Sequence, residues 1–122
     1  DTESLSLDER GNIKELGLEN PNIEDIDARY IGLIKFSKSG INYVLSILEE
    51  AYKHFLDKPW QQSGKTVKKA YMTDLLNAVI ESGRDVKAEI FHNGWIEFDT
   101  NEDYENAMKW TEEDSLSDIL QL

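Results

Sequence analysis

The sequence has no cysteine and few basic residues. Without thiols, disulfides and thiolate metal sites are excluded, and a reducing cytoplasm is the expected location. Lys and Arg number 13 against 25 Asp and Glu, so the formal charge is −12 over 122 residues. Nucleic acid is therefore not expected as a partner, because polyanion binding relies on clustered Lys and Arg. A single Mg²⁺-bound nucleotide remains compatible with this charge, since carboxylates hold the metal and the metal neutralises phosphates.

Long apolar runs are also missing. No run approaches the roughly 20 residues that span a bilayer, and no basic and apolar leader is present, so no membrane association is expected. The chain is long enough for one domain that buries roughly two-thirds of its unfolded surface. Its first residue is Asp1 rather than Met, which indicates a cut piece or a processed chain.

The first third of the chain has strand-like patterns. Residues 4–7 and 13–16 alternate polar and apolar, and the turn-forming residues 8–12 between them predict a hairpin. Residues 17–27 are polar and acidic and are expected to form an exposed loop. Residues 30–36 form a nearly continuous apolar run, which favours a central strand covered on both faces.

Two amphipathic helices follow. Ser37 or Ser39 can cap the first, whose apolar stripe extends from Ile41 to Phe55 and which Lys58-Pro59 should stop. Residues 60–69, with three lysines, read as a mobile loop. The second helix is expected over residues 70–82, with apolar positions at helical spacing and Asp74 on its polar side near its start; Gly83 marks its end.

A strand is expected over residues 86–91, and a second over residues 95–99, the two forming a hairpin or a neighbouring pair. In the second strand Trp95, Glu97 and Asp99 share one face, and Ile96 and Phe98 share the other. Thr100 and Asp103 then approximate a capping box that starts a helix over residues 101–110. Asp99 thus stands at the carboxyl end of a strand, where α/β sheets bind ligands. It is either a metal ligand or the last polar residue of a strand.

Three blocks of the sequence resemble, in order, the C-terminal half of the nucleotidyltransferase family, which includes sugar-phosphate nucleotidyltransferases and phosphocholine cytidylyltransferases. The blocks are YIGLIKFS at 30–37, AYMTDLL at 70–76 and GWIEFDTNEDYENA at 94–107. The resemblance implies an α/β, Rossmann-like fold with a mixed sheet and flanking helices. Residues 1–122 would then be a single partial domain, the acceptor-binding half, with residues 111–122 as a frayed C-terminal helix.

The resemblance also implies an activity. Such enzymes transfer a nucleotidyl group from a nucleoside triphosphate to a phosphorylated small acceptor, a sugar phosphate or phosphocholine, with Mg²⁺, and they release pyrophosphate. Their Gly-rich basic loop, of the form G-x-G-x-R, is missing from this chain. We therefore expect the intact protein to be the enzyme and this chain alone to be inactive. The alternative is a non-catalytic binding or assembly domain that keeps the scaffold.

By the same resemblance, Asp99 matches the second metal-binding carboxylate. Trp95 and Glu97 would face the acceptor, Gly32 would let the acceptor approach the backbone, and Asp74 would lie near the acceptor or brace its site. Each also has a plainer interpretation: Asp99 as a turn residue, Trp95 as a cover for the sheet, Glu97 as a solvated strand residue, and Asp74 as a favourable charge at a helix start.

The sequence departs from the family around Leu18, where relatives often carry a lysine for the phosphates. Candidate replacements are Lys14 and three lysines of the loop: Lys65, Lys68 and Lys69. The plainer interpretation is that the three loop lysines are solvated side chains. Cutting a sheet exposes strand edges and apolar helix faces, so the isolated chain is expected to be a homodimer or a swapped dimer.

Overall fold

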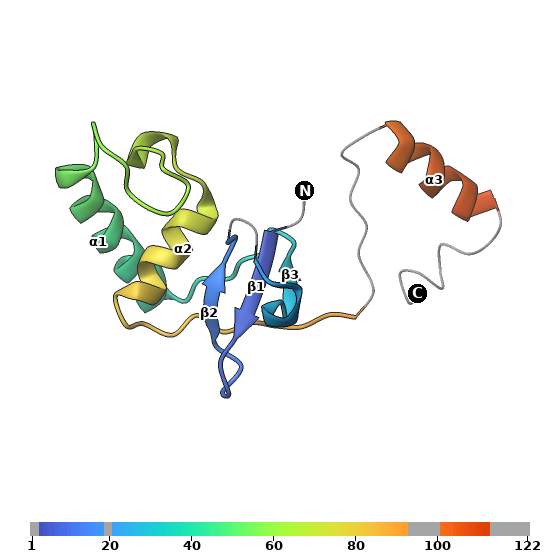
Figure 1. The fold of residues 1–122 in the computed structure, drawn as a ribbon, viewed down its shortest axis with the longest axis horizontal. Coiled ribbons are helices and arrows are strands. Elements are labelled where there is room, and N and C mark those ends of the chain that lie inside the picture. The colour runs from blue at the N-terminus through green and yellow to red at the C-terminus, as the bar shows by residue number, and fades with distance from the viewer. Residues whose placement is uncertain (1–2, 19–20, 93–100, 113–122) are drawn as a thin grey trace. The chain divides into compact units, whose positions relative to one another are not determined.

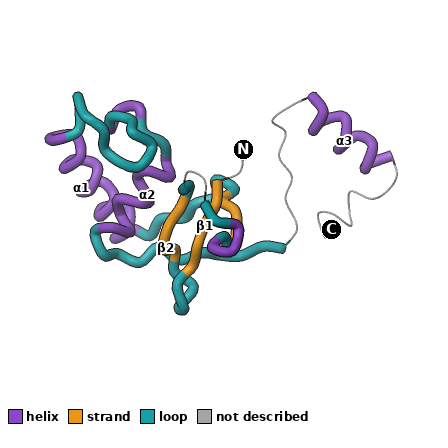
Figure 2. The backbone as a smooth tube through the Cα atoms, in the orientation of Figure 1, coloured by secondary structure: helices purple, strands orange, loops and turns teal. Residues whose placement is uncertain are grey.

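A computed structural model of the chain describes residues 3–18, 21–92 and 101–112. The chain divides into two units, Asp1–Ala88 and Glu89–Leu122, which we describe separately. The first holds a small sheet and two helices, and the second holds one helix (Figures 1 and 2). The interpretation of residues 1–122 as one partial domain stays a prediction.

The sheet has three strands: β1 (Glu3–Leu7), β2 (Ile13–Leu16) and β3 (Ala28–Tyr30), in the order β2-β1-β3. The expected hairpin is confirmed, since β1 and β2 pair antiparallel with Leu5 opposite Leu16. Asp8 closes the turn, because its Oδ1 accepts the N–H groups of Arg10 and Asn12 at 2.8 and 2.9 Å. The hydrogen bond from the Asn12 N–H lowers the pKa of the Asp8 carboxyl, although partial desolvation opposes it.

The expectation of a central strand at residues 30–36 is wrong. Only Tyr30 belongs to a strand, at the end of the short β3, and β1 occupies the centre of the sheet. Leu33 is 75% exposed, so the run is not covered on both faces. An apolar run becomes a central strand only where other elements cover both faces, and sequence pattern alone does not supply them. Dimerisation or swapping stays a prediction.

The strand expected at residues 86–91 is also absent as a regular element. Lys87 forms an isolated antiparallel bridge with Asn12. The Ile13 N–H donates to the Val86 carbonyl at 2.8 Å, and the Ala88 N–H donates to the Gly11 carbonyl at 3.3 Å. This segment thus follows the turn end of β2 without extending the ladder.

All strand pairs among the described residues are antiparallel. The α/β class is confirmed at the level of a small antiparallel sheet with helices. The mixed sheet implied by the resemblance is not found in the described part. Of the residues expected to supply its further strands, 31–36 form coil, 86–91 form only an isolated bridge, and 95–99 lie outside the described residues. The Rossmann-like arrangement stays a prediction.

The first two helices form close to their expected positions. α1 (Lys38–His54) begins after Ser37, whose Oγ accepts the Gly40 N–H at 2.9 Å. It ends before Lys58-Pro59 is reached, with Phe55 as its C-cap. α2 (Met72–Glu81) ends before Gly83, which has a φ of +96° that favours glycine.

The helix expected at residues 101–110 is confirmed as α3 (Asn101–Glu112), which is two residues longer. The strand expected at 95–99 lies outside the described residues, and so does most of the terminal helix expected at 111–122. No helix among the described residues is long and apolar enough to cross a membrane.

The core of the first unit lies between the sheet and α2. Its buried side chains come from both strands of the hairpin and from the helix: Leu5, Ile13, Leu16 and Leu76. α1 packs against α2, and both helices lie on the same side of the sheet (Figure 1). The alternation that predicted the hairpin therefore also determines its buried face, while Ser4, Ser6 and Glu15 point to the opposite face.

Candidate functional site

The structure describes two of the five residues expected in the site. Asp99, Trp95 and Glu97 lie in residues 93–100, outside the described part. Gly32 follows β3, and Asp74 lies in the first turn of α2. A shared role of Gly32 and Asp74 in an acceptor site stays a prediction.

Gly32 has a backbone reason to be glycine. Its φ is +85°, which side chains disfavour, yet a Cβ at this position would meet nothing within 4 Å. The conformation explains the residue without a ligand, and the approach of an acceptor stays a prediction. Nearby, burial raises the pKa of the Tyr30 hydroxyl, and the Glu3 carboxylate on the paired strand adds to this effect.

Asp74 is buried, contrary to its expected place on the polar side of the helix. Its side chain is 2% exposed. Oδ2 accepts the Tyr71 N–H and the Ser63 hydroxyl, both at 2.8 Å. The connection between α1 and α2 folds over the helix start and removes the carboxylate from water. Asp74 therefore braces that connection, and its role at an acceptor site stays a prediction.

Side chains from two segments converge on the carboxyl end of β2. Asn77 of α2 accepts the Leu16 N–H at 3.2 Å and donates to the Leu16 carbonyl at 2.7 Å. Gln62 donates to the carbonyls of Leu16 and Gly17 at 2.8 and 3.1 Å. Together with Ser63 and Asp74, these residues form what we call the β2–α2 junction: Leu16, Gly17, Gln62, Ser63, Asp74 and Asn77.

Sequence reasoning missed Asn77 and Gln62. Asn77 is 8% exposed, and the only signal was an amide within an apolar helical stripe. Gly17 was missed as well. Its φ is +68°, and a Cβ there would lie 2.6 Å from a Glu3 carboxylate oxygen and 3.5 Å from the Thr73 Cβ. The positive φ is what favours glycine here, because the Thr73 distance is an ordinary contact and the Glu3 side chain can move away.

Asp74→Ala is expected to destabilise the protein by about 1–3 kcal/mol, because the Tyr71 N–H and the Ser63 hydroxyl lose their acceptor. The free energy of unfolding from urea denaturation measures the effect. Asp57→Ala, at an exposed aspartate, is the control and should change stability by less than about 0.5 kcal/mol. Equal effects of the two substitutions would contradict a bracing role.

The loop expected at residues 60–69 is a hydrogen-bonded turn. The Trp60 N–H donates to the Lys65 carbonyl at 3.0 Å, and the Gly64 N–H donates to the Gln61 carbonyl at 2.9 Å. Val67 is 6% exposed, and its N–H donates to the Phe55 carbonyl at 3.0 Å. Val67 also begins a short 3₁₀ helix, Val67–Lys69. Gln62 and Ser63 belong to this turn, and their side chains connect it to the end of β2 and to Asp74.

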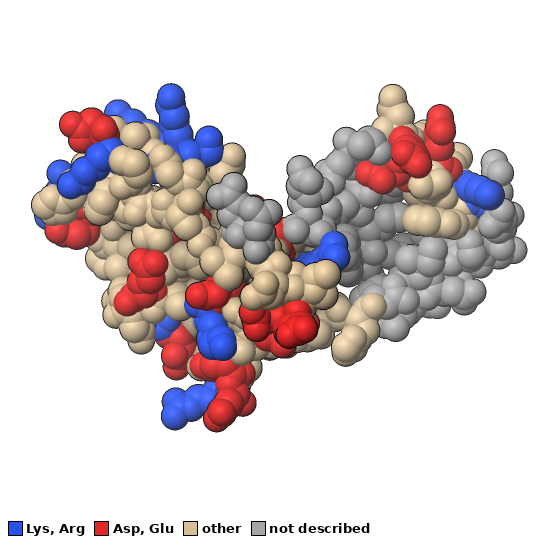
Figure 3. Space-filling model, viewed as in Figure 1, with Lys and Arg blue, Asp and Glu red and all other residues tan. Residues whose placement is uncertain are grey.

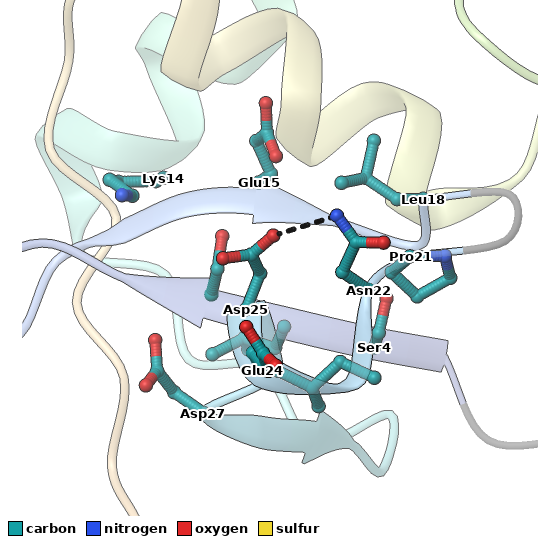
Figure 4. A pocket seen from close by; sticks show the side chains of 12 residues that line it. Ser4, Lys14, Glu15, Leu18, Pro21, Asn22, Glu24, Asp25 and Asp27 are labelled. Carbon is teal, nitrogen blue, oxygen red and sulfur yellow. Dashed lines mark hydrogen bonds between the residues drawn. The ribbon is translucent and has the colours of Figure 1, made fainter.

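A groove of about 870 Å³ lies beside the polar face of the sheet (Figure 4). Four acidic side chains and Lys14 are among its lining residues; the acids are Glu15, Glu24, Asp25 and Asp27. Two of the acids have local partners: Asp27 accepts the Leu7 N–H at 2.7 Å, and Asp25 accepts the Asn22 amide at 3.4 Å. The excess of negative charge makes the groove a poor place for a phosphate.

The described residues contain no group of three or more His, Asp or Glu side chains that could hold a metal ion. Asp74 is engaged with the Ser63 hydroxyl and the Tyr71 N–H. The expectation of Mg²⁺ therefore depends on Asp99, outside the described part, and stays a prediction.

Comparison with known proteins identifies a relative. The chain is 34% identical over 105 residues to a CTP:phosphoglutamine cytidylyltransferase of Campylobacter jejuni, and the match covers 86% of this chain and 39% of the relative. No family model matches the chain, and no solved structure matches it at a significant level. The chain is thus a distant homologue of a nucleotidyltransferase, which confirms the resemblance at that level, and it spans well under half of that enzyme's length.

Proposed function

We propose that the chain is the C-terminal, acceptor-binding part of a nucleotidyltransferase that uses CTP and a phosphorylated small acceptor. The observation that carries this proposal is the similarity to a cytidylyltransferase over 86% of the chain. The acceptor is a small phosphomonoester, of the kind found in phosphocholine, sugar phosphates or the phosphoglutamine of the relative's name. The intact protein is the enzyme.

In the proposed reaction, a phosphate oxygen of the acceptor forms a bond to the α-phosphorus of CTP. The bond from that phosphorus to the oxygen bridging to the β-phosphorus breaks, and pyrophosphate leaves with the electron pair. Mg²⁺ would supply the positive charge that brings these anions together, with Asp99 as a ligand assigned from sequence. Trp95 and Glu97 would form a wall for the acceptor, and the β2–α2 junction would brace the scaffold.

The test uses the intact protein with CTP, Mg²⁺ and one acceptor at a time: phosphocholine, glucose 1-phosphate or phosphoglutamine. Pyrophosphate release measures turnover. We expect release that requires an acceptor and falls more than about a hundredfold when EDTA removes the metal. No release with any of the three acceptors would instead support the alternative of a binding or assembly domain, and release that EDTA does not change would exclude the role of Mg²⁺.

A further inference from the structure

One short stretch of this acidic protein is basic. Residues 58–69, which we call the basic turn, contain four lysines and no Asp or Glu, although the whole chain carries a formal charge of −12. In Figure 3 several blue side chains lie at the end of the first unit where the connection between α1 and α2 runs, with some red side chains beside them, and red side chains predominate around the sheet. The turn is thus basic in sequence, although two acids of α2 contact it: Glu81 accepts the Gln61 amide at 3.3 Å, and the buried Asp74 accepts the Ser63 hydroxyl.

The backbone of the basic turn is held at several points. Its own hydrogen bonds join Trp60 to Lys65 and Gln61 to Gly64, and Val67 anchors it in the interior. Gln62 and Ser63 attach it to the β2–α2 junction. Lysines on a fixed backbone lose less conformational entropy on binding than lysines on an unstructured loop, which favours ligand binding.

The lysines of the turn are not used in ion pairs with described residues. The ion pairs of the described part join Glu50 to Lys53 and His54. Lys68 and Lys69 are exposed, and the Lys65 ammonium lies 5.2 Å from the centroid of the Tyr71 ring. By contrast, Lys14 lies in the acidic groove. Lys58 likewise lies 5.2 Å from the centroid of the Phe55 ring, so aromatic rings contact two of the four lysines. No acid of the described part neutralises the charge of Lys65, Lys68 or Lys69 in an ion pair.

We infer that the basic turn binds a substrate phosphate through Lys65, Lys68 and Lys69. Three lysines within five positions are enough to neutralise one phosphate group, whose charge is close to −2 at neutral pH. A long polyanion would instead meet the repulsion of the remaining acidic surface. The inference rests on the proposed function for the source of the phosphate, which is either the acceptor monoester or the triphosphate of CTP.

Binding can be tested without turnover. The ¹⁵N-labelled chain is titrated with phosphocholine or with pyrophosphate at constant ionic strength, and amide shifts are followed by NMR. We expect saturable shifts in residues 60–71. Phosphocholine should bind more tightly at about pH 7.5 than at about pH 5.5, because the second pKa of a phosphate monoester is about 6. A response to phosphocholine alone assigns the turn to the acceptor, a response to pyrophosphate alone assigns it to the nucleotide, and a response to both supports a general phosphate site.

The variant Lys65→Gln/Lys68→Gln/Lys69→Gln should weaken binding about eightfold, from roughly twofold per exposed contact. The control Lys35→Gln/Lys38→Gln/Lys87→Gln removes the same charge from exposed positions elsewhere and should change binding less than about twofold. Equal weakening in both variants, or no saturable shift below about 50 mM, would overturn the inference. If the intact protein turns over but the turn binds no phosphate, only this inference fails. If the turn binds phosphate but the intact protein turns over none of the acceptors, the proposed function fails.

Discussion

Asp99→Ala in the intact protein is expected to lower kcat by about 10²–10³-fold, which corresponds to about 3–4 kcal/mol of lost transition-state stabilisation. Negative charge accumulates when the acceptor phosphate approaches the α-phosphate, and a divalent cation held by carboxylates offsets it. Removing one carboxylate loosens that cation. Pyrophosphate release under saturating substrates and Mg²⁺ measures the change, and circular dichroism verifies that the variant is folded.

Two further variants separate metal binding from a general effect. Asp99→Glu keeps an oxygen ligand at a shifted position, so it should retain part of the activity and require a higher Mg²⁺ concentration. Glu102→Ala removes an exposed acid from the first turn of α3 and should leave kcat within about twofold of the unchanged protein. If Asp99→Ala turned over normally, Asp99 would not be the metal ligand, and its plainer interpretation as a turn residue would hold.

Leu16→Ala is expected to lower the free energy of unfolding by about 3 kcal/mol, within the range of 2–5 kcal/mol for truncation of a buried leucine. The Leu16 side chain is 0% exposed and belongs to the core cluster with Leu5, Ile13 and Leu76. Its truncation leaves a cavity whose walls are held in place by the Asn77 and Gln62 hydrogen bonds to the Leu16 backbone, so the surroundings collapse poorly. Urea denaturation followed by circular dichroism measures the loss.

Leu33→Ala is the matched control, since it makes the same chemical change at a side chain that is 75% exposed. It should alter stability by less than about 0.5 kcal/mol. A loss at Leu33 comparable to that at Leu16 would show that residues 31–36 are covered in solution, as a central strand would be.

The local elements could be predicted because their signals lie within a few residues. The alternation in residues 4–7 and 13–16 was enough for the hairpin, and Ser37 and Gly83 correctly marked a helix start and a helix end. The position of α3 followed from the helical pattern after Thr100. Each of these features depends on backbone geometry and hydrogen bonds between near neighbours.

The errors concern features that depend on distant neighbours. The apolar run at residues 30–36 predicted a covered strand, but the described elements leave Leu33 in solvent. Asp74 has the position of an ordinary first-turn acid, and it is buried only because Ser63 and its turn fold over it. For the candidate site, the sequence supplied five residues through a resemblance: Asp99, Trp95, Glu97, Gly32 and Asp74. Of the β2–α2 junction it named only Asp74, and it did not indicate that Gln62 and Asn77 meet the end of β2.

The sequence by itself determined the hairpin, the three helices, the strong negative charge and the resemblance to nucleotidyltransferases. Only the tertiary structure decided which side chains are buried and which segments meet. Asn77 satisfies the backbone of Leu16 across 61 positions of the chain, and Gln62 reaches the same strand end from a turn. Such contacts form because the core of Leu5, Leu16 and Leu76 brings the segments together. The lysines of residues 58–69 are visible in the sequence, but the attachment of their backbone to the sheet is a property of the fold.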